Sequence, residues 1–288
     1  MSSQNTISEK MEKIKTLFQQ TSDFASATDD LKSILLQINH SENEFYSVAF
    51  EATAMAFAEK DIIENSSLNR WKLFLLEEAE SHSSQVHVGL GWALAKHNID
   101  IQFYLGTVEP FMISRVLDGI GYYDGIFKQR QSINSKKISD KIDAVQLKHY
   151  DQGIGRSIWY SFLGNIPKVK EMIDSFPSSR HADLWRGIGI AFTYVGGFNE
   201  KMLDELYLMA AEHKSQLFIG AALVAKGRAQ SNTLNPETDK VCGAWFNLSA
   251  SDTVEIINNL LQDPTNKTYD QWLSAIEKQL TQSIIQKI

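Results

Sequence analysis

The sequence has little of what marks a secreted or membrane-spanning protein. Cys242 is the only cysteine among 288 residues, so an internal disulfide is excluded and an oxidising compartment has no support. A lone cysteine is more typical of a small buried residue than of a nucleophile. No apolar stretch approaches the ~18 residues that a membrane span needs, and residues 1–20 lack the apolar centre of a signal peptide. These absences predict a cytoplasmic protein with no membrane span.

Basic charge and proline are also scarce. Lys and Arg number 28 against 35 Asp and Glu, which gives a net charge of −7 without any basic run. This balance argues against nucleic acid and anionic membranes as partners. Only five prolines interrupt a chain that is 43% hydrophobic, so long helices around a buried core are expected.

Helical periodicity dominates, and no alternating pattern is long enough for a strand. We expect helices at residues 42–60, 68–80, 200–212, 252–261 and 269–286, and others that open after Pro110 and Pro167. Ser41 and Glu44 have the spacing of a capping box, and Ser251 is a candidate cap. The polar segment Ser132–Ser139 is the best candidate for an internal loop. This pattern predicts an all-α protein.

Glycine is more frequent than a helical chain needs, and most of it falls into a repeat. Nine of the 16 glycines share one register: Gly89, Gly91, Gly119, Gly121, Gly153, Gly155, Gly187, Gly189 and Gly220. Degenerate copies begin at Phe50 and Phe218, and the spacing between copies is near 34 residues. That period is typical of a helix–turn–helix repeat. Glycine costs about 0.5–1 kcal/mol against alanine within a helix, so its recurrence indicates close helix packing. A dinucleotide-binding loop would need a preceding strand.

The repeats predict about six helical hairpins, stacked into a curved solenoid or a closed α/α ring. We expect N-terminal helices at residues 1–40, the repeat domain at residues 41–262 and a C-terminal helix at residues 263–288, within one globular unit.

Ionisable residues recur beside the repeated glycines. The position before the first glycine and the position four residues later share one helix face. A neighbouring face carries the position one residue earlier and the position seven residues after that. Convergence of these faces would bring together five candidate acids or bases: Glu51, His87, Asp118, Asp124 and Asp151. The alternative for each is a structural ion pair between neighbouring helices.

Arginines and aromatic residues lie on the same helices. Candidate substrate-binding residues are Trp92, Tyr122, Tyr123, Arg156, Trp159, Arg180, Trp185 and Arg186. The arginines would hold an anionic end of a ligand, and the aromatic rings would line a cavity or stabilise a cation. The alternative reading of the aromatic stripe is an ordinary core.

Metal ligation has weaker support. The chain contains no Glu-x-x-His or His-Glu-x-x-His motif, and His82 and His87 are five residues apart. A divalent metal would bind only if folding gathered Glu51, Asp118 and Asp151 with His87. We therefore predict no cofactor and no metal site, while a divalent metal stays possible.

Four motifs together resemble a family of bacterial proteins of unknown function. They begin at Val86, Leu117, Tyr150 and Ala182 and run through the glycine pairs, and the resemblance covers residues 45–261. Members of that family are often encoded near enediyne polyketide biosynthesis genes, so the resemblance implies specialised metabolism without supplying a reaction. Tyr123 stands where the family pattern has His.

Together these observations predict an enzyme of the cyclase or isomerase type. It would bind a hydrophobic polyene or isoprenoid chain in an aromatic-lined helical cavity and rearrange it by proton transfer. Two alternatives stay open: a non-catalytic solenoid that binds a protein partner, and a carboxylate-bridged metal oxidase.

Overall fold

The computed structural model is entirely helical over the residues that it describes, which are all except 1–2, 40–42, 65–66, 98 and 286–288. Helix accounts for 81% of the described residues, and no strand occurs among them. The all-α prediction is therefore confirmed. No helix in those ranges is both long enough and apolar enough to cross a membrane. The predicted capping box at Ser41 falls outside the described residues.

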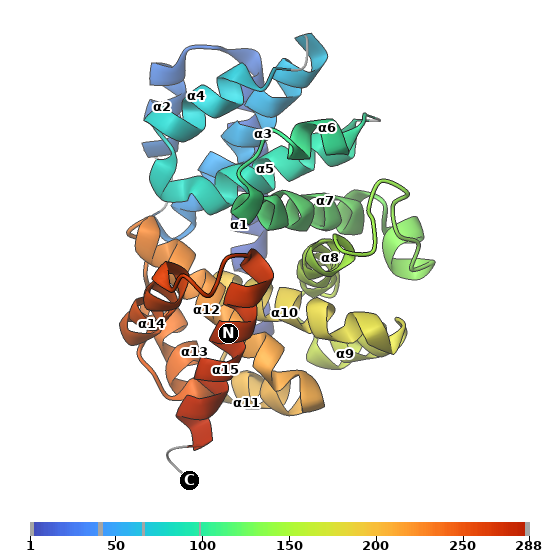
Figure 1. Cartoon of the computed structure of the whole chain (residues 1–288), viewed down its shortest axis with the longest axis vertical. Helices are drawn as coiled ribbons and strands as arrows, with labels where there is room; N and C mark the ends of the chain where they lie inside the picture. Colours follow the sequence, from blue (N-terminus) through green and yellow to red (C-terminus); the bar gives the residue numbers. More distant parts are fainter. Residues whose placement is uncertain (1–2, 40–42, 65–66, 98, 286–288) are drawn as a thin grey trace.

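Six helices that carry the glycine register form the centre of the molecule, and each packs on the next. They are α3 (Tyr46–Glu64), α5 (Ser83–Lys96), α7 (Ile113–Phe127), α8 (Leu147–Ser161), α10 (Ser178–Val195) and α12 (Lys214–Gln230). Figure 1 shows α5, α7, α8 and α10 following one another down the molecule.

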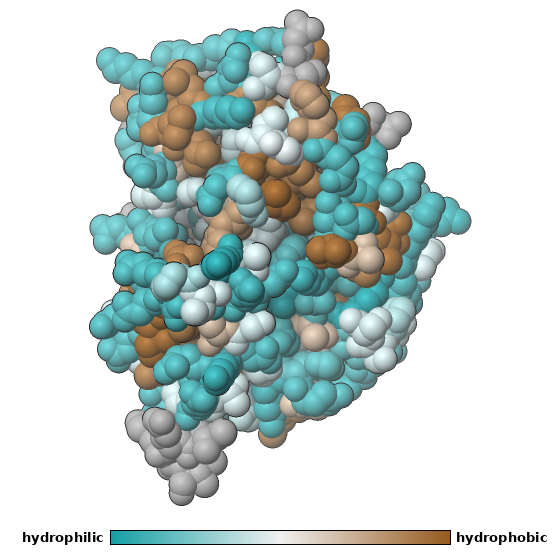
Figure 2. Space-filling model, in the orientation of Figure 1, coloured by the Kyte–Doolittle hydropathy of each residue, from teal (hydrophilic) through white to brown (hydrophobic). Residues whose placement is uncertain are grey.

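Shorter helices connect the central ones. These are α4 (Asn69–Glu77), α6 (Ile101–Leu105), α9 (Ile166–Asp174) and α11 (Glu200–Met209). The C-terminal helices α13 (Pro236–Phe246), α14 (Ala250–Gln262) and α15 (Tyr269–Ile285) gather beside α12. At the other end of the chain, α1 (Ser3–Ala27) packs along α3 and α2 (Leu31–Asn39) follows it. The face drawn in Figure 2 is mainly hydrophilic, with apolar residues visible between elements.

The repeated glycines lie where neighbouring backbones come closest. A Cβ added at Gly153 would lie 2.0 Å from the carbonyl oxygen of Asp118, and one at Gly121 would lie 1.9 Å from that of Tyr150. The same approach recurs between each pair of consecutive central helices. Because a methyl group has no room there, glycine sets both the spacing and the register of the helices. Residues in equivalent positions are thereby aligned from one helix to the next.

One local prediction is right in part and another is wrong. Residues 135–139 of the segment predicted as a loop are non-helical, but its first residues belong to a π-helical turn, Arg130–Asn134. That turn is anchored because Ile133 is buried and the Ser132 hydroxyl donates to the Asp124 carbonyl oxygen. The cap of α14 is Ser249 rather than Ser251, since the Ser249 side chain accepts from the Asp252 amide at 3.0 Å. The Asn199 side chain caps α11 by accepting from the Met202 amide at 2.9 Å.

Candidate functional site

A pocket of about 720 Å³ lies between α1 and all six central helices. This volume is within the ~300–1,000 Å³ range of small-molecule sites. The central helices line it with the position before the first glycine and with positions four and eight residues later: Glu51, Met55, Glu59, Val88, Trp92, Lys96, Asp118, Tyr122, Ile126, Arg156, Tyr160, Ile190, Tyr194, Leu223 and Gly227. The glycine register thus aligns one face of successive helices on one cavity.

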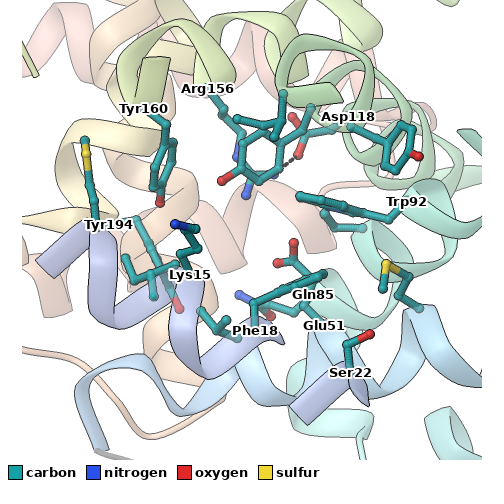
Figure 3. A pocket seen from close by; sticks show the side chains of 18 of the residues that line it. Lys15, Phe18, Ser22, Glu51, Gln85, Trp92, Asp118, Arg156, Tyr160 and Tyr194 are labelled. Atoms are coloured by element: carbon teal, nitrogen blue, oxygen red, sulfur yellow. Dashed lines mark hydrogen bonds and ion pairs between the residues drawn. The ribbon is translucent and has the colours of Figure 1, made fainter. Parts of the chain in front are cut away.

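Glu51 of α3 supplies a buried carboxyl group to the pocket wall. Its side chain is 6% exposed, and its carboxylate is turned into the cavity (Figure 3). Burial raises the pKa of Glu51 to about 7 because it removes water from the charged form. Arg156 lowers this pKa and Asp118 raises it, and the Trp92 N–H gives a small further lowering. Glu51 therefore changes its charge near neutral pH.

An ion pair between Asp118 and Arg156 faces Glu51 across the cavity (Figure 3). Arg156 Nη1 donates to Asp118 Oδ2 at 2.5 Å, and no other described group accepts from this guanidinium. Asp118 Oδ1 is buried without a hydrogen-bond partner in the described residues. The Arg156 guanidinium also lies 4.3 Å from the centroid of the Tyr122 ring. The remaining N–H groups of Arg156 are thus available to a ligand.

Aromatic rings form much of the pocket wall. The Trp92 ring packs at 4.9 Å against Tyr122 and at 4.8 Å against Phe18, which comes from α1. Tyr122 in turn packs at 5.6 Å against Tyr160. The Trp92 indole N–H is buried and makes no hydrogen bond of ordinary geometry within the described chain. The wall is therefore apolar over most of its area but presents a few unpaired polar atoms.

Arg228 also lines the cavity. Arg228 is 2% exposed and donates only to carbonyl oxygens, those of Glu44, Thr233 and Tyr194. Its guanidinium lies 4.8 Å from the centroid of the Tyr194 ring. No described carboxylate pairs with it, so its positive charge is not neutralised locally. The buried Tyr194 hydroxyl has no hydrogen-bond partner in the described residues either.

Six of the residues predicted from the sequence line this pocket. They are Glu51, Trp92, Asp118, Tyr122, Tyr123 and Arg156, from four consecutive central helices. Glu51 and Asp118 supply carboxyl groups, Arg156 supplies the cation, and the rings supply the wall.

The other predicted residues lie away from the pocket and are engaged in packing. Asp151 forms a buried ion pair with Arg180, and Arg186 donates to Gln152, Asp183 and Gln216. Asp124 accepts from Tyr150 and pairs with Lys128.

Three aromatic or heteroaromatic side chains of the predicted set are likewise buried outside the pocket. His87 Nδ1 donates a hydrogen bond to the Ser83 carbonyl oxygen at 2.7 Å, and the ring packs on Trp71. Trp159 packs on Phe192, and Trp185 is 2% exposed. Burial lowers the pKa of His87 to about 4, so this imidazole is neutral at pH 7.

Several pocket residues were absent from the sequence prediction. Tyr160 and Tyr194 lie eight residues after the position that precedes the first glycine of their helices. Following the same helix face for one more turn would therefore have identified both. Lys15 and Phe18 come from α1, which lies over the cavity (Figure 3), and no repeat signal includes them.

Metal ligands do not cluster in the described part of the chain: no three His, Cys, Asp or Glu side chains gather closely enough to hold an ion. Within the pocket, the carboxyl groups of Glu51 and Asp118 lie with Arg156 rather than with an imidazole.

The raised pKa of Glu51 predicts that the stability of the fold depends on pH. Its pKa is about 7 in the folded protein and near 4.5 unfolded, so between these values the folded state holds the proton more tightly. The free energy of unfolding should therefore fall by about 3 kcal/mol as pH rises through this window. Urea unfolding of the protein and of Glu51→Gln at several pH values measures this change. If the free energy of unfolding of Glu51→Gln falls with pH as steeply as that of the unsubstituted protein, the prediction is wrong.

Comparison with known proteins gives one match. The family model described as "Protein of unknown function (DUF1702)" matches residues 1–280. Neither the curated proteins nor the solved structures contain a match.

Proposed function

The chain belongs to the DUF1702 family, whose description states no activity, and from its pocket we propose that it is an enzyme that rearranges a hydrophobic polyene or isoprenoid chain by proton transfer. The reaction is an isomerisation or a cyclisation, and the substrate lies between α1 and the central helices.

The observation that carries this proposal is the Glu51 carboxyl group facing an aromatic-lined cavity. A carboxyl group whose pKa is about 7 is both a base and an acid near neutral pH, so it can remove a proton and return it in one cycle. Apolar walls exclude water from the reacting carbons. The rings of Trp92, Tyr122 and Phe18 can also stabilise a developing positive charge.

The same pKa favours isomerisation over cyclisation. Protonating an isolated double bond requires an acid much stronger than a carboxyl group of pKa about 7. Moving a proton between two carbons of an activated chain requires a group that is half ionised at the working pH. Glu51 meets the second requirement.

The architecture supports the proposal. We infer that the six central helices are copies of one helical-hairpin unit with a period near 34, curved as a solenoid or ring around the pocket. Consecutive pairs repeat the same carbonyl-to-glycine approach, and all six contribute to one cavity. The proposed setting is specialised metabolism, on the resemblance to proteins encoded near enediyne biosynthesis genes.

Exchange with deuterated water tests this activity. Conjugated polyenes and linear isoprenoids would be incubated with the purified protein in D₂O. The expected product has the elemental composition of its substrate and carries deuterium at the carbon that receives the proton, because the Glu51 carboxyl exchanges with solvent. Mass spectrometry with NMR locates the label. Product of changed composition, or the absence of label from every compound, would contradict the proposal.

A further inference from the structure

The arrangement of donors opposite Glu51 identifies a substrate class: we propose that Arg156 and Tyr160 bind the carbonyl oxygen of an unsaturated carbonyl compound. This inference rests on the proposed proton transfer by Glu51 and adds the group that the substrate must carry. A plain hydrocarbon would leave these buried donors unpaired, which weakens its binding.

Three hydrogen-bond donors meet on one side of the cavity. The Arg156 guanidinium and the Tyr160 hydroxyl both lie across the cavity from the Glu51 carboxylate (Figure 3). Tyr122 is the third donor, and its ring packs at 5.6 Å against that of Tyr160. The Tyr160 hydroxyl points into the cavity (Figure 3), where it can donate to a ligand.

The charges on the side of the cavity opposite Glu51 stabilise a negative charge that develops on a ligand. The Asp118 carboxylate offsets the Arg156 charge, whereas the buried Arg228 has no described carboxylate partner. Burial raises the pKa values of Tyr160 and Tyr194, and the Arg228 charge partly offsets this rise, so its field reaches these hydroxyls. A fixed positive charge behind neutral donors stabilises an oxyanion where water is excluded.

A permanently anionic head group fits less well beside Arg156, although the cationic residues Lys15, Arg115 and Arg228 also line the pocket. Arg156 is already paired with Asp118, and Glu51 adds a second carboxyl group to the same cavity. A diphosphate or carboxylate would bring its full negative charge next to the carboxyl groups of Asp118 and Glu51. A neutral carbonyl group acquires negative charge only as the proton leaves, which is when stabilisation accelerates the reaction.

The proton transfer balances without a cofactor. The Glu51 carboxylate removes a proton from a carbon next to the conjugated system, and the C–H electron pair shifts to give a dienolate. Its oxygen accepts hydrogen bonds from Arg156 and Tyr160. The Glu51 carboxyl then returns the proton to another carbon of the dienolate, which restores the carbonyl and moves the double bond. No atom or electron is gained or lost.

Binding of 2-naphthol tests the donor side independently of turnover. Its neutral and ionised forms differ in absorption and fluorescence, so the pKa of the bound molecule can be read directly by titration with the full-length protein. We expect that pKa to be at least one unit lower than in water. Tyr160→Phe should reverse most of the shift, whereas Tyr207→Phe, which changes a tyrosine on α11 outside the pocket, should not. Naphthalene, which lacks the oxygen, should bind at least tenfold more weakly.

Three results would overturn the carbonyl assignment. They are a bound naphthol whose pKa is unshifted or raised, a shift that persists in Tyr160→Phe, and a prenyl diphosphate that binds more tightly than naphtholate. Failure of the proposed function is distinguishable, because naphthol titration does not need Glu51 to transfer a proton. Glu51→Gln should keep the naphthol shift while deuterium exchange is lost.

Discussion

Replacing Glu51 with glutamine is expected to lower kcat by about 10²–10⁴-fold, as measured by deuterium incorporation into the product. Glutamine keeps the size and hydrogen-bonding capacity of the side chain but cannot accept and return a proton. In the unsubstituted protein, activity should rise as pH approaches 7, because the pKa of Glu51 is about 7 and the base form is needed to start the reaction. Glu51→Asp keeps the acid and should retain more activity than Glu51→Gln.

Two controls make this result specific. Glu9→Gln changes an exposed glutamate of α1 outside the pocket, so its turnover should equal that of the unsubstituted protein. Thermal unfolding of Glu51→Gln at pH 5 should be nearly normal, since Glu51 is mostly neutral there. If Glu51→Gln folds and keeps its turnover, Glu51 is not the catalytic acid or base.

The second large effect is structural and concerns Gly121. Gly121→Ala should lower the free energy of unfolding by at least about 3 kcal/mol, or prevent folding. The added methyl group would lie 1.9 Å from the Tyr150 carbonyl oxygen and 2.8 Å from its carbonyl carbon. These are backbone atoms inside α8, so they cannot move aside without moving the helix.

Gly243→Ala is the matched control within the same molecule. Gly243 lies in α13, where an added Cβ meets nothing within 4 Å. Because alanine favours helix over glycine, this substitution should stabilise the protein by about 0.5–1 kcal/mol. Denaturant unfolding of both variants measures the contrast. Equal effects would mean that glycine does not set the helix spacing.

Part of the pocket could be predicted because the same short pattern recurs. Asp118 and Tyr122 flank Gly119 and Gly121. Arg156 follows Gly153 by three residues, as Tyr122 follows Gly119. Helical geometry places such equivalent positions on one face, and the glycine contacts keep that face aligned between helices. Tyr160 and Arg228 were not predicted because they lie at the ends of their helices, beyond the repeated motif.

The contribution of α1 could not be predicted. Phe18 packs on Trp92, and Lys15 lines the cavity (Figure 3), yet α1 has no glycine pair and lies outside the repeated motif. Its position depends on contacts between distant segments, such as the ion pairs of Lys10 with Glu44 and Glu237 at 2.5 Å. No local pattern encodes such pairings.

The sequence by itself determined the helical class, the register of close approach and the set of ionisable residues beside it. Helix periodicity and the steric requirement for glycine act locally, so both can be recognised from the sequence. Only the tertiary structure decided which of the two neighbouring helix faces lines the cavity. Adjacent residues on a helix point about 100° apart, so Asp118 reaches the pocket while Asp151 and His87, one residue earlier in their repeats, are buried among other helices.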